Sequence, residues 1–154
     1  MRFVLVDRLL SVEPGKRATA SMVFPPDLPI FADHFPGRPI VPGTLVTEAM
    51  GQTGGWLLVS TLGFRQWPLL TMIDQAKFYK FVLPGDELLM EATIQASRAE
   101  DFEVLAEARV DAQRVARARF LFRVEPLLRE GDTTQALEEW ARQTYARLTQ
   151  PCGM

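Results

Sequence analysis

Residues 44–62 read TLVTEAMGQTGGWLLVSTL, and this stretch decides the fold. It contains no proline, and Glu48 is its only formally charged side chain. A helix that is apolar on all sides is normally buried in the protein interior. The stretch therefore predicts a long central helix. Its glycines at 51, 54 and 55 predict that another backbone segment approaches this helix closely.

The segments around this helix mostly alternate apolar and polar residues, a pattern typical of half-buried strands. The alternation predicts strands over residues 17–25, 88–96, 102–110 and 116–124, with an extended segment over 69–82. Six prolines between residues 25 and 43 predict an irregular connection, and the helical spacing of residues 133–148 predicts an appended amphipathic helix. We expect an α+β fold in which an antiparallel sheet wraps around the central helix. Residues 1–126 would form this domain, and residues 127–154 a C-terminal helical extension.

The composition excludes several classes of function. The chain has 154 residues with 17 basic and 19 acidic side chains, so it lacks the basic excess of a dedicated duplex-binding protein. One His and one Cys cannot build a zinc cluster, which needs about three or four such ligands, and we expect no metal or other cofactor. The weakly charged stretches are interrupted by polar residues and glycines, which predicts no membrane span. The single Cys favours a reducing compartment, and we expect a cytoplasmic protein.

The candidate chemistry lies in HFPGRPIVPG, residues 34–43, and in EAMGQ, residues 48–52. The first segment holds His34, the sole imidazole, in a proline-rich loop that leads to a helix start at Gly43. Backbone N–H groups at a helix start are an anion site, and Glu48 and Gln52 lie one turn apart on the same face. A base, a carboxylic acid and an oxyanion donor can together remove a proton beside a carbonyl and expel a leaving group. Each residue alone also fits a purely structural role, such as a helix-dipole carboxylate for Glu48.

Taken together, these segments resemble the signature of the FabZ-type 3-hydroxyacyl-[acyl-carrier-protein] dehydratases, a family with the hot-dog fold. The similarity extends to LVDR at 5–8, EPGK at 13–16, IDQAKF at 73–78 and PGD at 84–86. It covers about residues 3–124 in register. The resemblance implies a long helix wrapped by an antiparallel sheet, and a dimer formed by sheet pairing.

The resemblance also implies a role for each candidate residue. His34 would remove the α-proton of a (3R)-3-hydroxyacyl thioester, and Glu48 of the partner chain would protonate the departing hydroxyl to leave a trans-2-enoyl thioester. The Gly43 N–H would polarise the thioester carbonyl, and Gln52 would support Glu48. A glutamate at position 48 resembles the branch of the family that does not also isomerise the double bond. Asp33 replaces the usual glycine, and it could favour the protonated form of His34 or could point to solvent.

The same resemblance implies how substrate and partners are held. We expect an apolar acyl tunnel between the helix and the sheet, and its candidate lining residues are Phe35, Trp67, Pro68, Leu69 and Phe78. The substrate would be carried on the phosphopantetheine of acyl carrier protein, in fatty-acid or related acyl-chain biosynthesis. Acyl carrier proteins are acidic, so the candidate docking residues are basic: Arg38, Lys77 and Lys80. We expect a homodimer, with a trimer of dimers as a further assembly, and no nucleic-acid or membrane partner.

Two other functions stay open at this stage. A hot-dog thioesterase would share the fold and the acyl carrier but direct water at the same carbonyl. A non-catalytic subunit would bind acyl chains or complete the site of a partner, an alternative favoured by Asp33 and by the tail helix.

Overall fold

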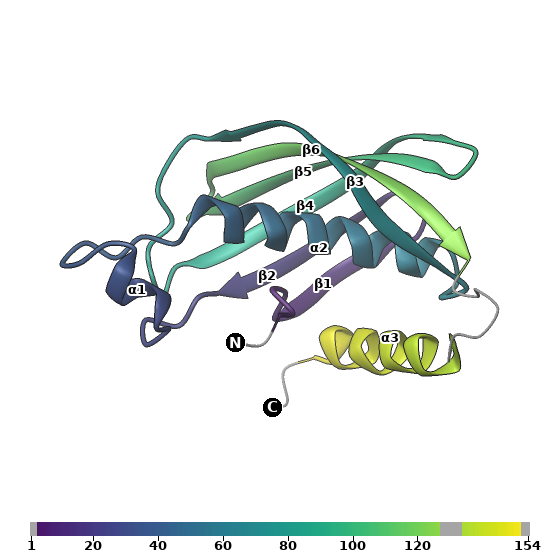
Figure 1. The fold of residues 1–154 in the computed structure, drawn as a ribbon, viewed down its shortest axis with the longest axis horizontal. Helices are drawn as coiled ribbons and strands as arrows, with labels where there is room; N and C mark the ends of the chain where they lie inside the picture. Colours follow the sequence, from purple (N-terminus) through teal and green to yellow (C-terminus); the bar gives the residue numbers. More distant parts are fainter. Residues whose placement is uncertain (1–2, 127–133, 152–154) are drawn as a thin grey trace.

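The computed structural model describes residues 3–126 and 134–151. In these residues, six strands form one antiparallel sheet that curves around helix α2 (Figure 1), which confirms the predicted α+β hot-dog fold. The elements in chain order are β1 (Arg8–Glu13), β2 (Arg17–Val23), α1 (Ile30–Asp33), α2 (Gly43–Thr61), β3 (Gln66–Phe78), β4 (Glu87–Arg98), β5 (Asp101–Val110), β6 (Gln113–Pro126) and α3 (Thr134–Thr149). The strand order across the sheet is β1-β2-β4-β5-β6-β3.

Helix α2 is the centre of the core, as its apolar sequence predicts. It contacts all six strands, and its side chains Met50, Leu57 and Leu58 are fully buried. Side chains, and not another backbone segment, pack closely against Gly51 and Gly54 of this helix. The prediction that a backbone segment approaches here is therefore wrong. A Cβ on Gly51 would lie 3.2 Å from the Phe120 ring, because aromatic residues of β6 fill the space against the helix.

Strand β1 is not among the strands that the alternation of apolar and polar residues predicts. Its pairing with β2 shifts register between Leu9 and Ser11, and this irregularity breaks the period of two on which strand prediction depends. The proline-rich segment likewise contains one short helix, α1, where we expected only irregular structure.

Strand β3 lies at one edge of the sheet and pairs with β6. Pro68 within it fits an edge position, because proline cannot donate a hydrogen bond to a second neighbour. No other strand pairs with β3 in residues 3–126. Several large apolar side chains of this strand are exposed: Leu69, Leu70, Met72, Ile73 and Phe78.

Helix α3 confirms the predicted tail helix and lies alongside β1, outside the sheet that wraps α2 (Figure 1). It buries Ala141, Thr144 and Leu148, which share one face of the helix. Arg142 Nη2 also donates a hydrogen bond of 3.3 Å to the Gly63 carbonyl oxygen, just beyond the end of α2. The expected domain boundary after residue 126 adjoins residues 127–133, which lie outside the described part of the chain.

Candidate active site

His34 is held by a tight loop between α1 and α2. Its backbone N–H donates to the Ile30 carbonyl oxygen at 3.0 Å, and the Ile40 N–H donates to the His34 carbonyl oxygen at 2.9 Å. Phe35 and Arg38 exchange two backbone hydrogen bonds within the loop. The imidazole stacks on the Phe35 ring with 4.1 Å between centroids. The prolines and these bonds therefore give His34 a defined position, as the sequence predicts.

The hydrogen bonding of the imidazole identifies which nitrogen can act as a base. His34 Nδ1 lies 2.9 Å from the Ile40 carbonyl oxygen. A carbonyl oxygen can only accept, so Nδ1 must carry the proton in this contact. In the neutral ring, Nε2 is then the unprotonated nitrogen, ready to take a proton from a substrate.

The start of α2 lies in the same cavity as His34. This cavity, of about 270 Å³, is lined by His34, Phe35, Gly43 and Phe78 among other residues. The N–H groups of Leu45 and Val46 donate to the Pro42 carbonyl oxygen, and these are the first hydrogen bonds of the helix. The N–H groups of residues 43 and 44 therefore precede the hydrogen-bonded turns of α2. A Cβ on Gly43 would lie 3.1 Å from the Phe78 ring, so glycine lets the ring pack directly on the helix start.

Glu48 is half-buried on α2 and is held through Gln52. Gln52 Nε2 donates to Glu48 Oε1 at 2.9 Å and to the Phe3 carbonyl oxygen at 3.0 Å. Gln52 Oε1 accepts a bond of 2.7 Å from the Leu5 N–H. These three bonds fix the orientation of the Gln52 amide and tie the Glu48 carboxyl to the N-terminal segment. Gln52 therefore sets where the Glu48 carboxyl lies.

Glu48 lines a different cavity from His34 within one chain. The second cavity measures about 370 Å³, and Glu48, Gln52, Trp67 and Pro68 belong to its lining. The expected tunnel residues thus divide between two cavities. Leu69 lines neither, because it lies between Pro68 and Leu70 on β3 and neighbouring strand residues point to opposite faces. The lining residues that sequence reasoning missed include Trp56, Phe122 and Trp140, which carry no motif of their own.

Asp33, the expected neighbour of the imidazole, has an exposed side chain. The hydrogen bond of His34 Nδ1 goes to a backbone carbonyl and not to this carboxylate. The solvent-facing alternative for Asp33 therefore fits the geometry.

The expected basic residues also fall on two surfaces. Arg38 and Lys80 border one open hollow, and the Arg38 guanidinium lies 5.8 Å from the centroid of the Phe81 ring. Lys77 instead borders a hollow on the outer face of the sheet with Glu103 and Arg117.

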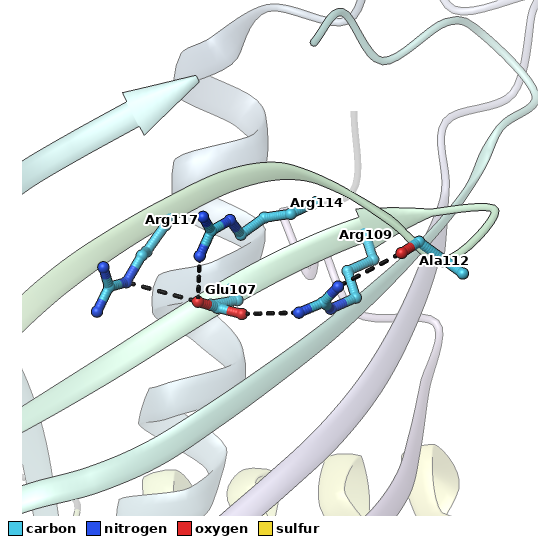
Figure 2. A network of polar contacts seen from close by, with 5 residues as sticks. All are labelled: Glu107, Arg109, Ala112, Arg114 and Arg117. Atoms are coloured by element: carbon cyan, nitrogen blue, oxygen red, sulfur yellow. Dashed lines mark hydrogen bonds and ion pairs between the residues drawn. The ribbon is translucent and has the colours of Figure 1, made fainter. Parts of the chain in front are cut away.

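Arg114 is a basic residue that the sequence argument missed. Its guanidinium lies 4.7 Å from the centroid of the ring of Tyr79, the residue that precedes Lys80 in the chain. Figure 2 shows that Arg109, Arg114 and Arg117 all meet the Glu107 carboxylate, at 3.2, 3.0 and 3.5 Å. Positive charge therefore exceeds negative charge in this cluster at the β5–β6 hairpin. The arginine-rich outer face of β6 was the signal in the sequence.

Among residues 3–126 and 134–151, no group of three or more His, Cys, Asp and Glu side chains is placed to hold a metal ion. In the same residues, every helix is too short or too polar to cross a membrane.

Comparison with known proteins identifies the family. Residues 1–119 match the model of the FabA-like domain. A 3-hydroxyacyl-[acyl-carrier-protein] dehydratase FabZ from Syntrophotalea carbinolica is 42% identical over 118 residues, covering 75% of this chain and 80% of that protein. The FabZ of Caldicellulosiruptor saccharolyticus is 36% identical over 124 residues, covering 80% and 89%. The chain belongs to the FabZ-type dehydratase family.

Solved structures agree with the fold of this FabZ-type protein. AziG of S. sahachiroi superposes with a TM-score of 0.65 at 19% identity, covering 78% of this chain and 91% of that one. A Haemophilus influenzae thioesterase gives 0.63 at 14% identity, covering 80% and 81%. At such low identity these similarities bear on the fold alone, so the second one does not support the thioesterase alternative. Helix α3 lies outside the residues that match the FabA-like model.

Proposed function

We propose that this FabZ-type protein removes water from (3R)-3-hydroxyacyl thioesters on acyl carrier protein, giving trans-2-enoyl thioesters in fatty-acid or related acyl-chain biosynthesis. The observation that carries the proposal is the contact between His34 Nδ1 and the Ile40 carbonyl oxygen, which leaves Nε2 free as a base beside the helix start at Gly43. No cofactor is required, because acid, base and oxyanion donor are all protein groups. The single Cys supports a reducing, cytoplasmic location.

The proposed reaction begins at His34. Its Nε2 takes the α-proton, and the electron pair of that C–H bond forms the new double bond. Negative charge that develops on the thioester oxygen meets the Gly43 N–H at the start of α2. A preformed donor of this kind contributes about 2.7–4 kcal/mol to the transition state. Glu48 protonates the leaving hydroxyl, the C–O bond breaks, and water departs. A proton passed from His34 to Glu48 through solvent then restores both groups.

The proposed site needs two chains. Within one chain, His34 and Glu48 line separate cavities, although both must touch the same substrate. The exposed apolar edge strand β3 supplies a surface on which a second copy can pair. We therefore propose a homodimer joined through β3, in which His34 of one protomer faces Glu48 of its partner.

One assay separates the three candidate functions. We expect the protein to hydrate a crotonyl thioester, measured as loss of the enoyl absorbance. Release of free thiol without loss of the double bond would favour the thioesterase. If neither occurs while acyl thioesters still bind, the protein is a binding subunit.

A second experiment addresses the carrier. Arg38→Glu and Lys80→Glu are expected to raise the KM for carrier-bound substrate several-fold, because both residues border the hollow next to the His34 cavity. The KM for a pantetheine thioester should not change, since that substrate lacks the acidic carrier. Lys16→Glu is the matched control, because Lys16 is exposed in the turn between β1 and β2, which lies by the C-terminal end of α2, away from Gly43. Equal effects on both substrates, or an equal effect of the control, would contradict this docking surface.

A further inference from the structure

The cavity that contains Glu48 runs lengthwise along α2. Glu48, Gly55 and Val59 follow one another along the helix and all line it. At a rise of about 1.5 Å per residue, the path from Glu48 to Val59 is about 16 Å long. Apart from Glu48 and Gln52, the lining side chains are aliphatic or aromatic, or the residue is glycine. The cavity therefore has one polar end and an apolar body.

Gly55 adds width to the middle of this cavity. A Cβ built on Gly55 meets nothing within 4 Å, in contrast to Gly51 and Gly54, whose Cβ positions touch core side chains. The space that a side chain would occupy at position 55 thus belongs to the cavity.

Three tryptophans from three elements meet in the apolar wall of this cavity. Trp56 of α2, Trp67 of β3 and Trp140 of α3 all line the cavity. The Trp140 ring centroid lies 6.0 Å from those of both Trp56 and Trp67, and Trp56 and Trp67 are 6.5 Å apart. These are contact distances for aromatic pairs. The appended helix therefore supplies part of the apolar wall beside Trp56, about two turns along α2 from Glu48.

The position of Trp140 is set by the docking of α3. Tyr145 packs edge-on against Phe64 with 5.1 Å between ring centroids, and Arg142 lies 4.8 Å from the centroid of the same ring. Ala141 and Leu148 are almost completely buried. The helix is thus anchored from Ala141 to Leu148, directly after Trp140 in the chain, and this docking fixes the position of the indole.

We infer that α3 closes the apolar part of the acyl-chain cavity and that Trp140 sets the longest acyl chain this enzyme accepts. The inference rests on the proposed function, since it takes the cavity beside Glu48 as the one that receives the acyl chain. The apolar part of this cavity begins at Glu48, so it suits the hydrocarbon chain that is attached to the reacting carbons of the substrate. Because α3 lies outside the matched FabA-like residues, this limit would belong to this chain rather than to the shared domain.

The test measures kcat/KM for hydration of enoyl-pantetheine thioesters of increasing length, from crotonyl through octenoyl and dodecenoyl to hexadecenoyl. For wild-type protein, kcat/KM should rise by about fourfold for each methylene that becomes buried, then stop rising when the chain end meets the tryptophans. Trp140→Ala should raise kcat/KM for substrates beyond that limit by about tenfold or more relative to kcat/KM for crotonyl. Leu137→Ala is the matched control, because Leu137 lies on α3 and does not line the cavity.

A second variant tests the same limit from inside the cavity. Gly55→Leu fills free space beside the tryptophan wall, so it should lower kcat/KM for the longer substrates relative to kcat/KM for crotonyl. This variant tests the chain-length limit even if Trp140→Ala does not fold. Unchanged length profiles in these variants, or the same shift in Leu137→Ala, would overturn the inference.

Failure of the proposed function would look different. Wild-type protein would then hydrate no enoyl thioester of any length. Calorimetric titration with saturated acyl-pantetheines of the same lengths would still measure the chain-length limit in wild type, Trp140→Ala and Gly55→Leu. The two statements can therefore fail separately.

Discussion

Replacing Glu48 by Gln is expected to lower kcat about 10²–10⁴-fold, the usual effect of losing a general acid. The amide keeps the size of the side chain, and its oxygen can still accept the hydrogen bond from Gln52 Nε2. It cannot give a proton to the leaving hydroxyl. The measurement is kcat for hydration or dehydration in protein shown to be folded and dimeric.

A matched control is Glu91→Gln, which makes the same chemical change at an exposed position on β4. This variant should keep its turnover. If Glu48→Gln lowers kcat by less than about tenfold, equivalent to about 1.4 kcal/mol in the barrier, Glu48 is not the acid. A helix-dipole carboxylate would show that smaller effect, together with some loss of stability.

Mixing two inactive variants is expected to restore activity. A dimer of one His34→Ala chain and one Glu48→Gln chain contains one site in which both residues are intact and one in which neither is. With equal amounts and free exchange, about a quarter of all sites should become active. The reason is geometric: within one chain the two residues line separate cavities.

The control is to mix each variant with more of itself under the same exchange conditions, which should restore nothing. Exchange itself is followed by mass labels on the two chains. Absence of recovery in a mixture with demonstrated exchange would mean that His34 and Glu48 act within one chain.

Much of the candidate site could be read from local sequence. The loop that holds His34 and the helix that carries Glu48 are each specified within about twenty residues. Gln52 was found because helical spacing places it on the face of Glu48, and the structure shows that hydrogen bond. Its other two bonds, to the segment at Phe3 and Leu5, join residues almost fifty positions apart and have no periodic signal.

The sequence alone determined the central helix, most of the strands, the tail helix and the family, because each depends on local periodicity or on a contiguous motif. Only the tertiary structure separated the cavities of His34 and Glu48, turned Leu69 away from both, and placed Arg114 over the Tyr79 ring. Only the tertiary structure, too, placed Trp140 beside Trp56 and Trp67. Amphipathic spacing predicts that a helix such as α3 buries one face, but it carries no information about which distant surface receives that face. That choice depends on the shapes that the sheet and α2 present together, and these exist only once the chain has folded.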